Sequence, residues 1–241
     1  MVRKDWKVRW GLLDKLRQSF KSRLNGPFIT ELLVGINVLV FIWLTLVGGS
    51  TNIMVLVTHG AMVPELVKNG NALLTIFTSM FVHIGIEHIL FNMITLYFIG
   101  RLLEGIIGHW KFLTIYVLSG IFANVVTLAF SSPNTVSAGA SGAIFGIIGV
   151  WLMMAEQYRD YPFLAGMGRQ MLIFSVLGIL GGFIGTNINI IAHVGGLVAG
   201  FLLAYIISFP NLGKVPTWKR SSGAVLLLFM MATFLKLAFT L

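Results

Sequence analysis

Long apolar stretches separated by short polar segments dominate this sequence. Seven of these stretches are long enough, or nearly long enough, to cross a bilayer as a helix. Such a crossing takes about 20 residues. They cover residues 28–47, 87–103, 111–130, 141–155, 170–186, 190–209 and 223–241. The pattern predicts an all-α membrane protein in which some helices are short or tilted.

The apolar stretches divide the chain into three parts. Residues 1–27 hold eight Lys or Arg residues among apolar side chains, so we expect an amphipathic segment on the membrane surface. Residues 28–209 form a core of six predicted transmembrane helices. Residues 210–241 form a cytoplasmic linker and a seventh transmembrane helix.

The Lys and Arg residues between the stretches predict the orientation. If the N-terminus is inside, the inner segments carry nearly all of these cations, and the outer segments carry only Lys68 and Lys236. Cytoplasmic loops of membrane proteins have such an excess of positive charge. We therefore expect a multi-pass membrane protein with a cytoplasmic N-terminus, in the cell membrane of a bacterium.

Composition narrows the function classes. The chain is 57% hydrophobic and only 10% charged, against about 25% charged in a soluble domain. The absence of cysteine excludes disulfides, thiol nucleophiles and cysteine-bound metals. The net charge of +9 gathers at the N-terminus beside the first apolar stretch. We therefore expect a lipid bilayer as its partner, and no nucleic acid.

The first outer loop, residues 48–86, is long and unusually apolar. Loops longer than about 12–15 residues commonly carry function or contain structure of their own. We expect this loop to be structured and to lie partly in the membrane interface, although a simple connector is the alternative.

Four polar residues fall inside the predicted helices, where polar groups are costly unless paired or hydrated. They are His88, Asn92, Ser141 and His193, and each lies within about five residues of the outer end of its helix. At 1.5 Å per residue this places them at a similar depth, less than about 8 Å below the helix start. Taken singly, each could serve only to make an interhelical hydrogen bond.

Ser141 and His193 are each followed by glycines spaced four residues apart, which are Gly142 and Gly146 in one helix and Gly196 and Gly200 in the other. Small residues at this spacing let membrane helices approach closely. Tight packing alone would explain the glycines. If the two helices meet, however, a hydroxyl and an imidazole come within reach of each other, as an activated serine requires.

The acidic residues do not supply a third catalytic group. By the predicted topology only Glu65 and Glu87 lie outside, and Glu87 faces away from its neighbour His88. A Ser–His dyad is therefore simpler than a triad. Phe145, one turn after Ser141, could stack on His193 and orient it. His88, Asn92 and the backbone N–H of Ser141 are the natural donors to an oxyanion.

Together these residues resemble the rhomboid family over roughly residues 70–205. The motifs that carry the resemblance are His83-x4-His88-x3-Asn92, Glu104, the YVLSG of residues 116–120, the GASGAIFG of residues 139–146, and Ala192-His193-x2-Gly196-x3-Gly200. The chain departs from the family near Leu74 and Thr75, where many members have Trp-Arg, and at Ile190 and Ile191, where many have Asn-Gly.

The resemblance implies a rhomboid-like six-helix transmembrane bundle with an added seventh helix. It also implies an intramembrane serine endopeptidase that cleaves transmembrane proteins and needs no metal or other cofactor. Ser141 would be the nucleophile and His193 the general base, with His88, Asn92 and the Ser141 N–H binding the oxyanion. Gly139, Phe145 and His83 would line the site.

Three other functions stay open. The first is a non-catalytic rhomboid-like protein that binds membrane clients. The second is a metalloenzyme using His83, His88 and His193, and the third is a transporter. The sequence does not specify the physiological substrate or the oligomeric state.

Overall fold

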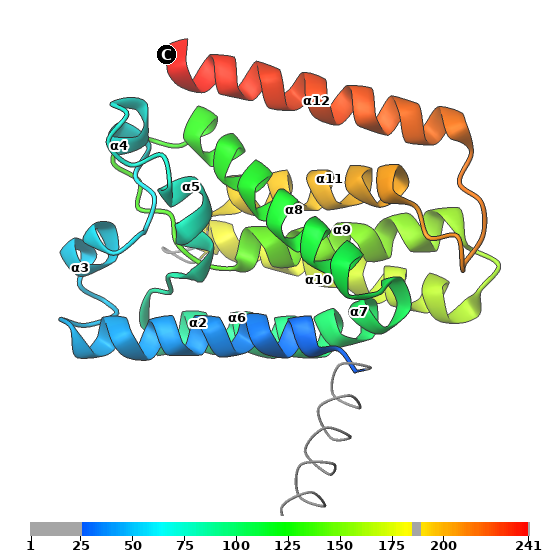
Figure 1. Ribbon diagram of the computed structural model, residues 1–241, viewed down its shortest axis with the longest axis horizontal. Coiled ribbons are helices and arrows are strands. Elements are labelled where there is room, and N and C mark those ends of the chain that lie inside the picture. Colours follow the sequence, from blue (N-terminus) through cyan, green and yellow to red (C-terminus); the bar gives the residue numbers. More distant parts are fainter. Residues whose placement is uncertain (1–25, 185–188, 241) are drawn as a thin grey trace, which may run out of the picture.

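The computed structural model describes residues 26–184 and 189–240. The expected amphipathic segment over residues 1–27 lies almost entirely outside these ranges. The long helices are α2 (Phe28–Leu46), α8 (His109–Phe130), α9 (Ser141–Gln157), α10 (Pro162–Ile184), α11 (Ile190–Ile207) and α12 (Thr217–Thr240), together with a continuous span made of α6 (Gly85–Thr95), a π-helical turn (Leu96–Gly100) and α7 (Arg101–Ile107) (Figure 1).

Each predicted apolar stretch corresponds to one of these spans, which confirms the all-α membrane bundle. Among the described residues, six helices are long and apolar enough to cross a membrane, and α9 is shorter at 17 residues. Two helices begin earlier than predicted, α10 at Pro162 and α12 at Thr217. The residues before the predicted starts include Gly166, Gly168 and Arg169 in α10, and Lys219 and Arg220 in α12. Such residues are compatible with a helix but interrupt an apolar pattern.

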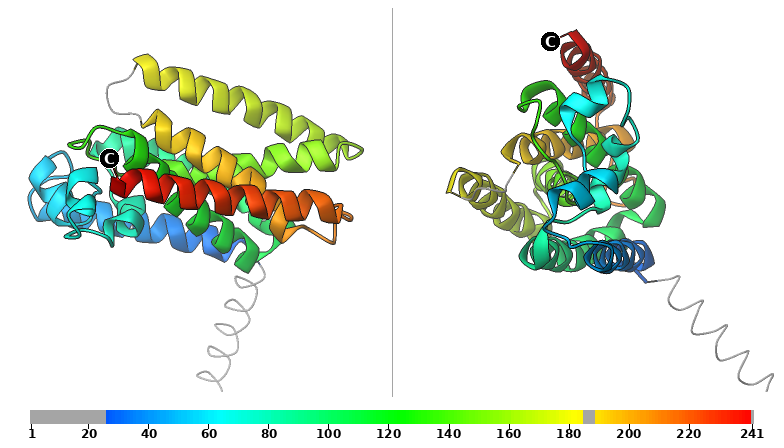
Figure 2. Two further views of the ribbon diagram at one scale, coloured as in Figure 1. Left: turned by 90° about the horizontal axis from the view of Figure 1, so that it is seen from above. Right: turned by 90° about the vertical axis from the view of Figure 1, so that its left-hand side faces the viewer.

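Helix α9 runs through the middle of the bundle, and α10 and α12 lie at its edges (Figure 2). Nearly all of α9 is buried, including the large side chain of Trp151. In contrast, only 22% of the apolar window of α10 and 11% of that of α12 are buried. Helix α9 is therefore the element around which the core is built, and the edge helices present apolar faces suited to lipid.

Glycines bring α9 and α11 into direct backbone contact. A methyl group added at Gly196 would lie 1.9 Å from the carbonyl oxygen of Gly142, and one at Gly200 would lie 1.9 Å from that of Gly146. No side chain fits at either position. The close approach predicted from the glycine spacing is therefore present, with each pair facing the other.

The first outer connection contains its own structure, as expected from its length. It folds into α3 (Ile53–Thr58), α4 (Pro64–Lys68), α5 (Thr75–Thr78) and a 3₁₀ turn (Ser79–Phe81). It is tied to the loop that leads into α9, residues 131–140. Met62 and Ser137 exchange two backbone hydrogen bonds of 2.8 Å, and the Gly139 N–H donates to the Ser79 carbonyl at 2.9 Å.

Near Leu74 and Thr75, where the sequence departs from many rhomboids, side chains still stabilise the connection. The hydroxyl of Thr75 donates to the Ala72 carbonyl at 2.6 Å, and that of Thr78 donates to the Gly60 carbonyl at 2.9 Å. Local hydroxyl-to-backbone bonds therefore hold this part of the connection in place.

The buried carboxylate of Glu104 fixes α7 to the start of α2. It accepts hydrogen bonds from the backbone N–H groups of Ile29 at 2.9 Å and Thr30 at 2.7 Å, and from the Thr30 hydroxyl at 2.6 Å. His109 Nδ1 lies 2.5 Å from the same carboxylate. The Glu104 side chain thereby satisfies N–H groups at the start of α2, which have no partner within their own helix.

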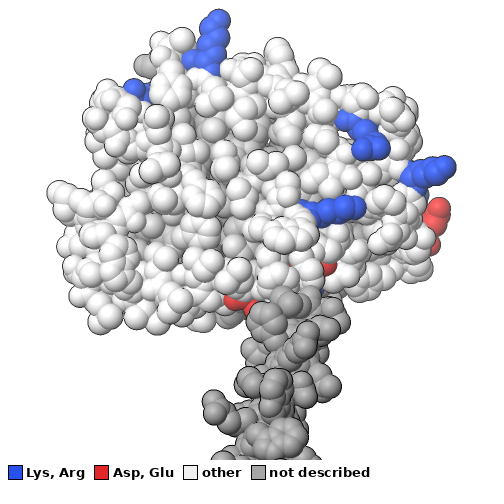
Figure 3. Space-filling model, in the orientation of Figure 1, with Lys and Arg blue, Asp and Glu red and all other residues white. Residues whose placement is uncertain are grey.

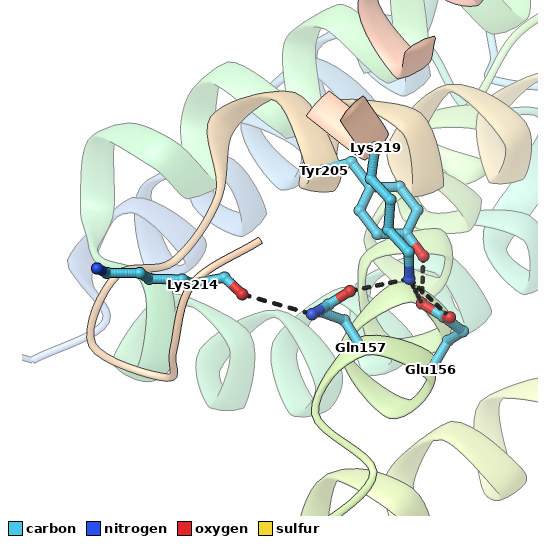
Figure 4. Close-up of polar contacts among 5 residues, drawn as sticks. All are labelled: Glu156, Gln157, Tyr205, Lys214 and Lys219. Carbon is cyan, nitrogen blue, oxygen red and sulfur yellow. Dashed lines mark hydrogen bonds and ion pairs between the residues drawn. The ribbon is translucent and has the colours of Figure 1, made fainter. Parts of the chain in front are cut away.

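A polar cluster holds the beginning of α12 against the ends of α9 and α11 (Figure 4). Lys219 Nζ contacts Glu156 at 2.9 and 3.1 Å and donates to the Gln157 side chain at 3.0 Å. The Tyr205 hydroxyl donates to Glu156, and Gln157 donates to the Lys214 carbonyl at 3.5 Å. This cluster attaches the start of α12, and farther along the helix Phe234 packs against Phe122 and Phe130 of α8.

Charged side chains are sparse on the face of the molecule seen in Figure 3. Lys and Arg lie toward its two ends, with more of them at the end where α11 and α12 are joined. That end carries Lys214, Lys219 and Arg220 in or just after the connecting segment. The uncharged surface between the ends is suited to the interior of a bilayer.

Candidate active site

Three helices begin at the end of the bundle where α3, α4 and α5 lie (Figure 1). Ser141 is the first residue of α9, His88 is the fourth of α6, and His193 is the fourth of α11. Asn92 follows His88 by one turn. The four polar residues therefore lie near the same end of the bundle, each at or close to a helix N-terminus.

The segment before Ser141 makes a sharp turn at Gly139, whose φ of 122° is a conformation that L side chains rarely adopt. Hydrogen bonds hold both sides of this turn. The Gly139 N–H donates to Ser79, and the Ala140 N–H donates to His83 Nε2 at 3.3 Å. Ser141 is therefore half-buried near one end of the bundle, and the backbone before it is fixed by hydrogen bonds.

His83 is a support for this turn. Burial, together with the neighbouring His88, lowers the pKa of His83 to about 3, so its imidazole is neutral near pH 7. A neutral ring whose Nε2 lacks a proton can accept the hydrogen bond from Ala140. The ring of His88 lies 5.2 Å from that of His83 in an edge-to-face arrangement.

His193 is buried and stacks on Phe145, with ring centroids 4.0 Å apart and planes inclined by 11°. Phe145 is one turn after Ser141 on the same helix face. Nearby, a methyl group at Gly142 would lie 3.7 Å from the Ala192 carbonyl, so the residues adjoining Ser141 and His193 are close neighbours. The helices therefore meet at the level of the two candidate catalytic residues.

The described residues contain no hydrogen bond between Ser141 and His193, and Nδ1 of His193 is buried without a partner. Catalytic hydrogen bonds are often long or poorly aligned before substrate binds. The stacked ring sets the plane of the imidazole.

His88 and Asn92 both face Gly139, two residues before Ser141. A methyl group at Gly139 would lie 2.7 Å from His88 Nε2 and 3.8 Å from Asn92 Nδ2. His88 Nδ1 accepts from the Ile84 N–H at 3.4 Å, so a neutral His88 carries its proton on Nε2. Asn92 uses one amide hydrogen on the His88 carbonyl at 2.9 Å and has a second to donate.

A small cavity with a polar lining adjoins Ser141. Its wall includes Met80, Gly120, Asn124 and Ser137. Asn124 is oriented by hydrogen bonds from Nδ2 to the Ser79 hydroxyl at 3.0 Å and the Ile76 carbonyl at 2.8 Å. The cavity is so small that it holds at most about one water molecule next to the hydroxyl.

Comparison with known proteins identifies a family whose sequence model matches this chain. Residues 70–209 match the family model described as the Rhomboid domain, which is more than half of the chain. This chain belongs to the rhomboid family. The assignment confirms the resemblance seen in the sequence motifs, and the matched region runs from the first outer connection to the end of α11.

Several curated relatives resemble this rhomboid. The rhomboid protease GluP of Bacillus subtilis (strain 168) is 36% identical over 212 residues, which is 88% of this chain and 41% of that protein. The putative rhomboid protease YdcA of the same organism is 38% identical over 133 residues, or 54% and 65% of the two chains. The rhomboid protease GlpG of Salmonella newport (strain SL254) is 31% identical over 134 residues, covering 54% and 47%. The match thus spans less than two thirds of each relative.

One site residue of this rhomboid was missed by the sequence analysis. Asn189 caps α11, because its side-chain oxygen accepts from the Ala192 N–H at 3.0 Å. Its amide nitrogen donates to the Thr127 hydroxyl at 3.1 Å and the Ser137 hydroxyl at 3.2 Å. It therefore joins the start of α11 to α8 and to the loop before Ser141. An Asn directly before an apolar run is a recognised helix-start signal and could have identified it.

Replacing Asn189 by alanine is expected to lower both stability and activity. Loss of a helix cap costs about 0.5–2 kcal/mol, and two further hydrogen bonds are lost. Because His193 is one turn later, its position relative to Ser141 also changes. Thermal unfolding in detergent and cleavage of a transmembrane substrate would measure the two effects. Asn69→Ala, at an exposed site, is the control, and an Asn189→Ala variant that behaved like it would contradict the capping role.

Proposed function

We propose that this rhomboid is an intramembrane serine endopeptidase that hydrolyses peptide bonds of transmembrane proteins, with Ser141 as nucleophile and His193 as general base. The observation that carries the proposal is the stacking of His193 on Phe145, one turn from Ser141, where α9 and α11 touch through glycines. This contact supports a Ser–His pair at a buried position open toward one end of the bundle.

In the proposed reaction, Ser141 Oγ attacks the carbonyl carbon of the scissile peptide while His193 takes the hydroxyl proton. The developing oxyanion accepts hydrogen bonds from the Ser141 N–H, His88 Nε2 and Asn92 Nδ2. The C–N bond then breaks as His193 donates its proton to the leaving amine. Water, deprotonated by His193, attacks the acyl-enzyme, and the proton returns to Ser141 as the acid product leaves.

The substrate must present an extended backbone. A transmembrane helix satisfies its own backbone hydrogen bonds, so its peptide groups are not free until the helix locally unwinds. We propose that substrates are single transmembrane segments with a helix-destabilising stretch and a small residue at the cleavage point. In the orientation that places the cationic linker in the cytoplasm of a bacterial cell, the site faces the outside.

Covalent labelling tests the proposed nucleophile without any knowledge of the substrate. A fluorophosphonate probe is expected to label the parent protein at Ser141, to label Ser141→Ala not at all, and to label His193→Ala far more slowly. A non-catalytic client-binding rhomboid would leave the parent unlabelled. Labelling that persisted in Ser141→Ala would show that the nucleophile lies elsewhere.

The oxyanion donors are expected to act on the chemical step. His88→Ala and Asn92→Ala should each lower kcat by about 10²–10³-fold and change KM little, because the lost bonds form mainly in the transition state. Steady-state cleavage of a transmembrane substrate in liposomes would measure both constants. His59→Ala, in the outer connection, is a matched control. A large rise in KM with unchanged kcat would instead assign the two residues to substrate binding.

A further inference from the structure

Phe145 lies between the candidate base and the edge helix α10. Its ring, 4% exposed, stacks on His193. It also occupies the space beside Gly178 of α10. A methyl group at Gly178 would lie 2.8 Å from Phe145 Cζ, and its next two neighbours would be Cε2 at 3.7 Å and Cε1 at 3.8 Å. All three nearest atoms belong to this one ring, so the absence of a side chain at Gly178 leaves room for Phe145.

The Phe145 ring contacts both His193 and α10, the latter at Gly178. Within the described part of the chain, no hydrogen bond or ring contact joins α10 directly to His193. The face of α10 that carries Gly178 points inward, because Ser175, three residues earlier, is buried. The opposite side is exposed at Leu177 and Leu180. A helix that is mostly surrounded by lipid thus contacts the ring that sets the plane of the imidazole.

We propose that Gly178 is a positioning residue, which lets α10 hold Phe145 flat against His193 so that the placement of α10 sets the orientation of the base. The inference rests on the proposed role of His193. Offset or parallel stacking depends on the distance and tilt of the two rings, so a shift of Phe145 shifts the preferred plane of the imidazole.

The test compares two glycines of the same helix. Gly178→Ala places a methyl group against Phe145, whereas Gly181→Ala, three residues later, places one where no atom lies within 4 Å. Both changes raise helix propensity equally. Gly178→Ala is expected to lower kcat by about tenfold to a hundredfold, as small misplacements of catalytic groups do. KM should stay within about twofold, and Gly181→Ala should match the parent in both constants.

Rescue distinguishes positioning from a general packing defect. Phe145→Leu removes the ring and should itself lower kcat, but in that background Gly178→Ala should have little further effect. The melting temperature of each variant in detergent is measured alongside. If Gly178→Ala unfolds the protein, the Phe145→Leu variant by itself tests the inference. A folded Phe145→Leu variant with parental kcat overturns the inference.

Two other results would also overturn it. They are a parental kcat in Gly178→Ala, and a full loss of kcat on adding Gly178→Ala to Phe145→Leu. Neither result would contradict the role of Ser141 as nucleophile. The proposed function is contradicted by a different result, which is cleavage that persists in Ser141→Ala. The two failures are therefore distinguishable.

Discussion

Ser141→Ala and His193→Ala are each expected to reduce the cleavage of a transmembrane substrate by at least about 10⁴-fold, with little change in substrate binding. Without the Oγ there is no acyl-enzyme, and without the imidazole the hydroxyl remains a weak nucleophile. Because the two residues act as one unit, the double variant should be no less active than either single variant.

The measurement is cleavage of a labelled single-span substrate in liposomes, with binding followed separately by co-purification or quenching. Ser132→Ala, in the exposed part of the loop before α9, and His59→Ala are matched controls that leave the site untouched. Retained cleavage in Ser141→Ala would end the assignment. A double variant far less active than both single variants would mean that Ser141 and His193 contribute independently rather than as a dyad.

Gly200→Val is expected to destabilise the bundle and to abolish activity together. Its Cβ would lie 1.9, 2.5 and 2.6 Å from the carbonyl oxygen, carbonyl carbon and Cα of Gly146. These are backbone atoms, which cannot rotate aside as a side chain can, so α11 must move away from α9. Overpacking of a core typically costs about 1–3 kcal/mol, and a contact with a rigid backbone belongs at the upper end.

The loss of activity follows from the position of His193 on the displaced helix. A shift of α11 by about 1 Å is enough to lower catalysis by roughly a hundredfold. Thermal unfolding in detergent and the liposome assay would measure the two effects. Gly35→Val introduces the same side chain in α2, where no atom lies within 4 Å of the new Cβ, and should have a far smaller effect. A Gly200→Val protein with the parental melting temperature would contradict the close contact.

The sequence alone determined the class of the fold, and it predicted most residues of the candidate site but not Asn189. Apolar run length is a local property, so all seven spans could be predicted, although α10 begins at Pro162 rather than at residue 170. The systematic error was at helix starts such as Thr217, where polar residues belong to the helix but not to the apolar run. Ser141 and His193 were predicted as candidates because polar groups are rare in a membrane span and these two fall near helix ends.

Contacts between distant parts of the chain were decided only by the tertiary structure. The backbone bonds between Met62 and Ser137, the links from Asn189 to Ser137, and the space at Gly178 filled by Phe145 depend on the rotation and shift of one helix against another. Four-residue glycine spacing indicates that α9 and α11 can touch, but not which glycines face each other. Helix packing in lipid depends on how well the surfaces of two whole helices fit together. A local pattern in the sequence of one helix does not specify that fit.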